Sequence, residues 1–102
     1  MATLYITEYS DVAIASLGTF TQIALEPKVA NQTVAIGGGS TASSAFNAGT
    51  RLVRLHTDAI CSVDFGTAPT ASATTRRMAA NQTEYFGVPV NSAYKVAVIT
   101  NT

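Results

Sequence analysis

The stretch Arg51–Phe65, "RLVRLHTDAICSVDF", decides the fold class of this chain. In its second part, the apolar Cys61, Val63 and Phe65 alternate with polar residues. Alternation with a period of two is typical of a β-strand that has one buried face. The run "RLVRLHT" before it also reads as a strand, and only a short turn at Asp58 separates the two runs. We therefore predict that the two runs form a β-hairpin.

Similar runs recur along the chain, and turn residues follow at intervals of about ten positions. Strands are expected over Thr3–Tyr9, Phe20–Glu26, Thr33–Ile36, Ser40–Phe46, Thr83–Val90 and Tyr94–Ile99, while Asp11–Leu17 reads as a strand or a short helical turn. This spacing predicts an all-β fold, a small antiparallel β-sandwich or barrel of Greek-key or jelly-roll type with roughly 7–9 short strands.

The length of 102 residues predicts one β domain over residues 1–102. Within it, residues 1–10 are expected to form an arm or an edge strand. Leu4 and Ile6 share the apolar face of this segment, while Tyr5 and Tyr9 lie on the other face. An arm of this kind can add a strand to the sheet edge of a neighbouring molecule.

Charge is low and balanced, with six basic and six acidic residues, and charged residues make up 12% of the chain. Because a neutral chain has no global field to attract polyanions, we expect no nucleic-acid partner and no membrane partner. Apolar runs such as Val96–Ile99 are far shorter than a membrane helix. No basic segment and apolar run follow Met1, so we expect no secretory signal. A surface with so little charge suits a protein that packs against others.

Candidate catalytic groups are sparse. His56, Asp58 and Cys61 lie within six residues of one another, but they provide too few ligands for a zinc site, and Cys61 reads as a core residue. Cys61 is also the only cysteine, which excludes an intrachain disulfide. Gly37–Ser40 lacks the frame of a phosphate-binding loop. We therefore expect no catalytic, cofactor or metal site, and a protein that is not an enzyme.

Candidate protein-interface residues come from two segments, and they are Tyr5, Tyr9, Arg76, Arg77 and Met78. The pair Arg76–Arg77 follows a loop of small residues, and both Arg and Met are enriched at interface cores. The alternative interpretation of this pair is a solvated loop tip. The tyrosines all fall in expected strands, which favours packing over a sugar-binding platform, and the chain has no Trp.

The tetrapeptide "ANQT" occurs twice, as Ala30–Thr33 and Ala80–Thr83. Both copies match the acceptor pattern for N-glycosylation, but no secretory route is expected. We therefore interpret Asn as closing a turn and Thr as opening a strand in each copy. The alternative is an internal duplication of half a fold.

The second half of the chain resembles small β-rich proteins that are encoded among the structural genes of tailed bacteriophages. The resemblance covers roughly residues 50–100 and is carried by Val53–Leu55, Ala59–Ala71, Arg77–Val88 and Lys95–Ile99. The chain departs from the pattern at "VNSA" (90–93), where a tight glycine turn is often seen.

The resemblance implies a virion structural protein, namely a head decoration (cement) protein that binds and stabilises the capsid. The implied partners are the major capsid protein or other virion proteins, together with further copies of the chain as a homo-oligomer, with a trimer among the options. The implied location is the virion, after synthesis in the cytoplasm of a host bacterium. Alternatives are a head–tail connector, a tail structural component, or a glycan-binding module. The family pattern carries over no catalytic residue.

Overall fold

A computed structural model describes residues 2–14, 18 and 20–102 of the chain. Its ten strands are β1 (Thr3–Tyr9), β2 (Val12–Ile14), β3 (Phe20–Ala24), β4 (Ala30–Ala35), β5 (Thr41–Ala42), β6 (Leu52–Thr57), β7 (Cys61–Gly66), β8 (Arg76–Met78), β9 (Thr83–Gly87) and β10 (Lys95–Thr100). The described residues contain no helix, and hence none that is long and apolar enough to cross a membrane.

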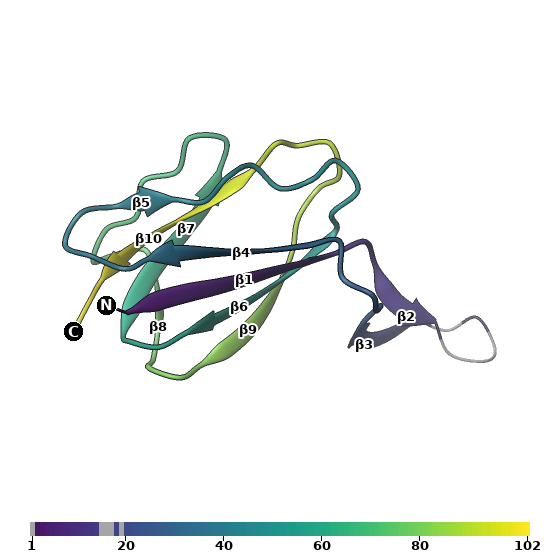
Figure 1. The fold of residues 1–102 in the computed structure, drawn as a ribbon, viewed down its shortest axis with the longest axis horizontal. Coiled ribbons are helices and arrows are strands. Elements are labelled where there is room, and N and C mark those ends of the chain that lie inside the picture. The colour runs from purple at the N-terminus through teal and green to yellow at the C-terminus, as the bar shows by residue number, and fades with distance from the viewer. Residues whose placement is uncertain (1, 15–17, 19) are drawn as a thin grey trace.

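Eight of the strands form two four-stranded antiparallel sheets that lie face to face (Figure 1). The first sheet has the order β4-β1-β6-β9, and the second sheet has the order β5-β10-β7-β8. From β4 onward, every connection except the one from β7 to β8 passes from one sheet to the other. Such crossing connections are typical of Greek-key and jelly-roll sandwiches. The predicted all-β antiparallel sandwich is confirmed.

The core lies between the inner faces of the two sheets. Leu4 and Ile6 are fully buried in it, as their alternation in the sequence predicted. Cys61 and Val63 are buried opposite them, and Phe65 packs against the same cluster. The buried cluster comprises Leu4, Ile6, Val34, Ile36, Phe46, Val53, Leu55, Cys61, Val63, Met78, Val96 and Val98.

The predicted hairpin between β6 and β7 is wrong, because β6 belongs to the first sheet and β7 to the second. The Thr57 hydroxyl donates a hydrogen bond to the Ala59 carbonyl at 2.6 Å and accepts one from the Ala59 amide at 3.2 Å. It also accepts a weak hydrogen bond from the Cys61 thiol at 3.5 Å. These contacts fix a tight crossover, so the two strands face each other across the core instead of pairing side by side.

The N-terminal strand β1 is an inner strand and not the predicted arm or edge strand. It pairs with β4 on one side and with β6 on the other. Tyr5, for example, lies opposite Thr33 on β4 and opposite His56 on β6. Because both of its edges carry ladder hydrogen bonds, β1 cannot add to the sheet of a neighbouring molecule in this structure.

The element that projects instead is the ribbon, which we define as strands β2 and β3 together with the segment 25–29 that leads back to the sandwich. The two strands pair only with each other and are inserted between β1 and β4 (Figure 1). The radius of gyration is 13.8 Å, slightly above the ~13 Å typical of 100 residues. The predicted element over 11–17 is a strand up to Ile14, and residues 15–17 lie outside the described part.

The two ANQT copies occupy different structural positions. Residues 30–33 lie within β4, whereas Asn81 sits in a turn with a positive φ of 61° and Thr83 begins β9. The predicted turn is therefore right for the second copy and wrong for the first. Because β4 and β9 are the opposite edges of one sheet, the copies are not equivalent positions of two repeated halves.

Candidate interaction surfaces

The outer face of the first sheet carries aromatic and polar side chains from four strands. Cross-strand pairing places Thr33, Tyr5, His56 and Thr83 in one row. The His56 Nδ1 atom lies 2.8 Å from the Thr83 hydroxyl, and the Tyr5 and His56 ring centroids are 6.3 Å apart. This contact orients the imidazole beside the Tyr5 ring.

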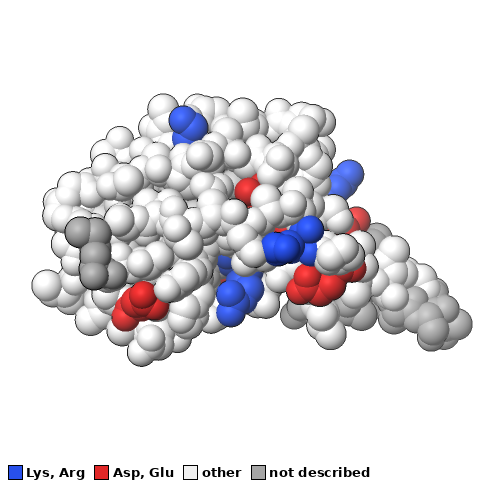
Figure 2. Space-filling model, in the orientation of Figure 1, with Lys and Arg blue, Asp and Glu red and all other residues white. Residues whose placement is uncertain are grey.

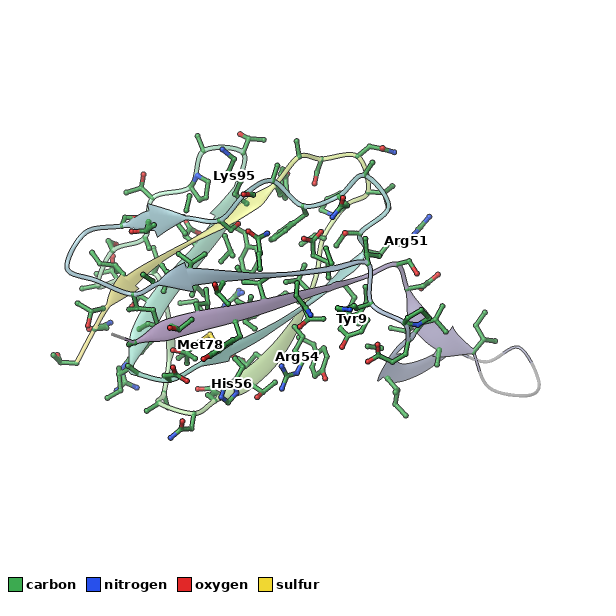
Figure 3. All side chains as sticks on the ribbon, in the orientation of Figure 1. Tyr9, Arg51, Arg54, His56, Met78 and Lys95 are labelled. Carbon is green, nitrogen blue, oxygen red and sulfur yellow. The ribbon has the colours of Figure 1, made fainter. Side chains whose placement is uncertain are left out.

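The next row of the same face contains Asn31, Thr7, Arg54 and Tyr85. Tyr5 is 43% exposed and Tyr85 is 53% exposed, although both are large aromatic residues. Figure 3 labels Arg54 and His56, which both project from β6. In the described part of the chain, neither the Arg54 guanidinium nor the Tyr85 hydroxyl makes a side-chain hydrogen bond, and both groups interact electrostatically with Tyr9. We call Tyr5, Arg54, His56 and Tyr85 the aromatic face.

A shallow hollow of about 540 Å³ lies over this part of the sheet. It is lined by Tyr5, Ile6, Thr7, Asn31, Gln32, Thr33, Arg54 and His56. The Gln32 side chain is held in place, because it donates to the Ser44 carbonyl at 3.2 Å and accepts from the Ser44 amide at 2.9 Å. On the outer face, the hollow combines the Tyr5 ring with the Asn31 amide and the Arg54 guanidinium.

The outer side of the second sheet is partly covered by the chain itself. Ser62 points away from the core but is fully buried, and the Asn101 amide donates to its hydroxyl at 2.6 Å. The same amide donates to the Ala73 carbonyl at 3.3 Å. Ala71 is also buried, and its backbone amide donates to the Ser40 hydroxyl at 2.9 Å. The C-terminal segment and the loop before β8 thus cover this side, whereas the aromatic face stays open.

The ribbon exposes apolar side chains to solvent. Ile14 is 61% exposed and Ile23 is 68% exposed, and Leu25 and Val29 are also exposed. At the base of the ribbon, the buried Tyr9 donates a hydrogen bond to Glu26 Oε2 at 3.1 Å (Figure 3). Burial and this carboxylate both raise the pKa of Tyr9. A projecting element with exposed Ile and Leu side chains indicates a protein-contact surface.

The third surface is a groove of about 380 Å³ between the edge strands β8 and β9. It is lined by Val63, Asp64, Phe65, Thr75, Arg76, Phe86, Gly87, Val88, Pro89 and Tyr94. The Phe65 and Phe86 ring centroids are 5.0 Å apart, and the Arg76 guanidinium lies 4.8 Å above the Phe86 ring. The groove thus has an aromatic floor and a cationic rim.

The five predicted interface residues do not form one surface. Tyr5 lies on the aromatic face, while Arg76 and Arg77 are exposed on β8 at the edge of the second sheet. β8 is a paired strand and not a loop tip, because it pairs with β7. Tyr9 is 5% exposed, and Met78 is fully buried within the sandwich (Figure 3). Met78 therefore belongs to the core, and neither of these two side chains is presented to a partner.

The candidate metal or acid–base set is separated by the fold. His56 points outward from the first sheet, while Cys61 points into the core from the second. Burial raises the pKa of the Cys61 thiol, which disfavours the reactive thiolate. No group of three metal-ligating side chains occurs within the described ranges.

Searches against family models, curated proteins and solved structures find no match to this chain.

Proposed function

We propose that the protein is a phage virion structural protein, specifically a decoration protein that binds the outside of the head through its aromatic face. The observation that carries this proposal is the open outer face of the first sheet, where Tyr5 and Tyr85 are exposed and Arg54 is half-buried on the strand between them. Tyr and Arg are the residues that most often dominate the binding energy of protein interfaces.

The scaffold supports this role. A closely packed sandwich holds the aromatic face rigid, so little conformational entropy is lost when it docks. Figure 2 shows charged residues scattered over a mostly uncharged surface, and the formal net charge is zero. Close copies on a lattice therefore repel one another little. A protein that binds the assembled lattice but not the loose subunits stabilises the lattice by mass action. The resemblance over residues 50–100 is what points to a phage virion.

The proposal is tested by co-sedimentation of the purified protein with heads assembled from the major capsid protein of the same genome. We expect the wild-type protein to sediment with the heads. A Tyr5→Ser/Tyr85→Ser variant is expected to bind at least about tenfold more weakly, because each buried aromatic anchor is typically worth more than 1 kcal/mol. Binding that is absent in the wild type, or unchanged in the variant, would overturn the proposal. If the protein instead binds isolated tails or connectors, the head–tail connector or tail role replaces it.

A glycan-binding function is the second candidate, and the hollow beside Tyr5 favours it. An aromatic ring next to Asn31 and Arg54 offers a sugar both an apolar platform and planar hydrogen-bonding groups. Tyr85 lies on this surface, but Tyr94 lines the groove instead, so the two tyrosines do not form one platform. Binding on a glycan array that is lost in Tyr5→Ala and in Asn31→Ala would support this function. An array without signal for the wild type would exclude it.

A further inference from the structure

Strand β9 leaves one edge of the first sheet open. Its five residues, Thr83–Gly87, pair only with β6, and Figure 1 shows β9 as the border strand of its sheet. Of the other edge strands, β5 and β8 are only two and three residues long, and the Gln32 side chain ties β4 to Ser44. An open strand edge is a template on which another strand can pair.

The hydrogen bonds to β6 fix which backbone groups of β9 point to the open edge. The Thr57 amide donates to the Gln82 carbonyl at 3.2 Å, and the Val88 amide donates to the Arg51 carbonyl at 2.9 Å. Because hydrogen-bonded residues alternate with non-bonded ones along an antiparallel pair, every second residue from Gln82 to Val88 bonds to β6. The intervening residues carry their amide and carbonyl groups at the open edge, and they are Thr83, Tyr85 and Gly87.

The three outward residues are spaced for pairing with a second copy of the same strand. When two β9 strands lie antiparallel with Tyr85 opposite Tyr85, Thr83 of each copy lies opposite Gly87 of the other. Each of these is then a hydrogen-bonded pair, so every outward amide and carbonyl group of the three residues gains a partner. The contact is isologous, with a twofold axis at Tyr85, and it joins the first sheets of the two copies into one continuous sheet.

The side chains on the core-facing side of β9 decide whether this pairing is favourable. Glu84 lies opposite the buried Leu55 of β6, so its half-buried side chain is on the core-facing side. Within the described ranges, the Glu84 carboxylate forms neither an ion pair nor a hydrogen bond. A charge at such a position of an edge strand opposes pairing unless the second copy provides an opposite charge.

Arg76 provides that opposite charge. It lies opposite the buried Val63 of β7, so it is on the core-facing side of β8, and its guanidinium lies 4.8 Å above the Phe86 ring. In the antiparallel pair of β9 strands, Glu84 of one copy lies directly opposite Phe86 of the other. This is a non-hydrogen-bonded pair, in which the side chains are closest. The Glu84 carboxylate therefore comes beside the guanidinium above that ring, and the twofold axis forms this contact twice.

We propose that two copies of the chain associate through their β9 edges into a homodimer, in which Glu84 of each copy pairs with Arg76 of the other. The inference rests on the proposed function in that it names the contact by which copies associate on the virion. The dimer carries two aromatic faces on one continuous sheet. Two linked docking faces bind a lattice more tightly than one, because the second binding event is intramolecular.

Sedimentation velocity of the full chain over a dilution series tests the inference. The wild type is expected to show a concentration-dependent equilibrium between monomer and dimer. Glu84→Arg and Arg76→Glu are each expected to raise the dissociation constant at least about tenfold, because like charges then meet twice in the dimer. Arg77→Glu is the matched control, since it makes the same charge change on the opposite face of β8, and it is expected to leave the dimer unchanged. A wild type that is monomeric at every concentration would overturn the inference.

Mixing the two reversed variants tests whether the contact joins different copies. Each variant repels further copies of itself, but a mixed dimer of Glu84→Arg with Arg76→Glu has opposite charges at both contacts. We expect the mixture to dimerise as the wild type does, and a single chain that carries both substitutions to dimerise by itself. Circular dichroism checks that each variant is folded. Folded preparations that stay monomeric in both cases would overturn the pairing of Glu84 with Arg76.

A cysteine substitution tests the register. The Cα atoms of a hydrogen-bonded antiparallel pair are about 5.5 Å apart, which is within the range that a disulfide spans. Tyr85→Cys is therefore expected to give a disulfide-linked dimer on mild oxidation, detected on a non-reducing gel. Thr83→Cys is the control, because the two copies of this residue would be about 14 Å apart along the strands. A linked Thr83→Cys dimer, or an unlinked Tyr85→Cys dimer, would contradict the twofold axis at Tyr85.

The outcomes separate this inference from the proposed function. A wild-type protein that stays monomeric but still sediments with heads overturns the β9 contact and leaves the decoration role intact. A dimer that requires Glu84 and Arg76 but does not bind heads overturns the decoration role and supports the β9 contact. An oligomer that survives both charge reversals but is lost in an Ile14→Ser/Ile23→Ser variant places self-association on the ribbon and overturns the inference.

Discussion

The hydroxyl of Thr50 donates a hydrogen bond to Glu8 Oε1 across 2.7 Å, and both side chains are buried. The same oxygen accepts hydrogen bonds from the Asn47 backbone amide at 2.8 Å and from the Asn47 side chain at 3.2 Å. A buried carboxylate is costly unless donors surround it. Glu8 therefore anchors the turn 47–50 to β1 just before the chain enters β6.

Replacing Glu8 should destabilise the fold strongly. We expect Glu8→Ala to lower the free energy of unfolding by about 2–3 kcal/mol, because Thr50 and Asn47 lose their shared acceptor in a buried site. Urea unfolding followed by circular dichroism measures the change. Asp58→Ala, at an exposed bend, is the matched control and should change stability by no more than about 0.5 kcal/mol. Equal effects in the two variants would contradict the anchoring role of Glu8.

A substitution at Met78 tests whether this side chain belongs to the core or to an interface. Met78→Ala is expected to lower the free energy of unfolding by about 2–4 kcal/mol, since it opens a cavity between the sheets. The neighbouring Arg77→Ala, an exposed position on the same strand, serves as the control and is expected to stay close to the wild type. Chemical denaturation of both variants tests this. A stable Met78→Ala protein would mean that this side chain is not in the core.

Cys61 reports on the integrity of the sandwich. Its side chain is fully buried and its pKa is raised by burial, so alkylation by iodoacetamide should be very slow in the folded protein. In denaturing urea the same thiol should react completely, as measured by mass spectrometry of the intact chain. Rapid alkylation under native conditions would show that β7 does not present Cys61 to the core.

The raised pKa of Tyr9, at the base of the ribbon, makes the free energy of unfolding depend on pH in the alkaline range. Its pKa in the folded state is raised above the usual 10.0 by burial and by the contact with Glu26. Above pH 10.0 the unfolded chain therefore loses this proton first, and the stability that protonated Tyr9 contributes falls as the pH rises through its folded-state pKa. Tyr9→Phe should show a shallower decline in the free energy of unfolding over this range, measured by urea unfolding below and above pH 10.0. Identical pH profiles for the two proteins would contradict the raised pKa.

Alternation in the sequence was sufficient to predict which strand residues enter the core between the sheets, but not that Ser62 and Tyr9 on the outward faces are also buried. Alternation placed Leu4, Ile6, Cys61 and Val63 in the core, and the structure confirms each of them. The same alternation is silent about which strands are neighbours, because a strand buries the same face whether its successor pairs with it or crosses to the other sheet. That is why the predicted hairpin between β6 and β7 was wrong.

The candidate surfaces were less predictable for related reasons. The position of β1 inside its sheet depends on long-range pairing with β4 and β6, which no local pattern reports. Met78 follows the exposed residues Arg76 and Arg77 in the sequence. Neighbouring side chains of a strand point to opposite faces, so Met78 points away from the face of Arg77, and this alternation was the available signal for its burial. Glu8 shares the face of Leu4 and Ile6 by the same rule, so its burial could have been inferred, but its partners at Asn47 and Thr50 could not.

We propose that this protein decorates the outside of a phage head. Cryo-electron microscopy of virions produced from the genome that encodes the chain tests it most directly, with mass spectrometry of the same particles. We expect density for the sandwich on the outer surface of the head, with the aromatic face around Tyr5 and Tyr85 turned toward the capsid. Absence of the protein from purified virions, or its density only at the neck or tail, would show that it is not a head decoration protein.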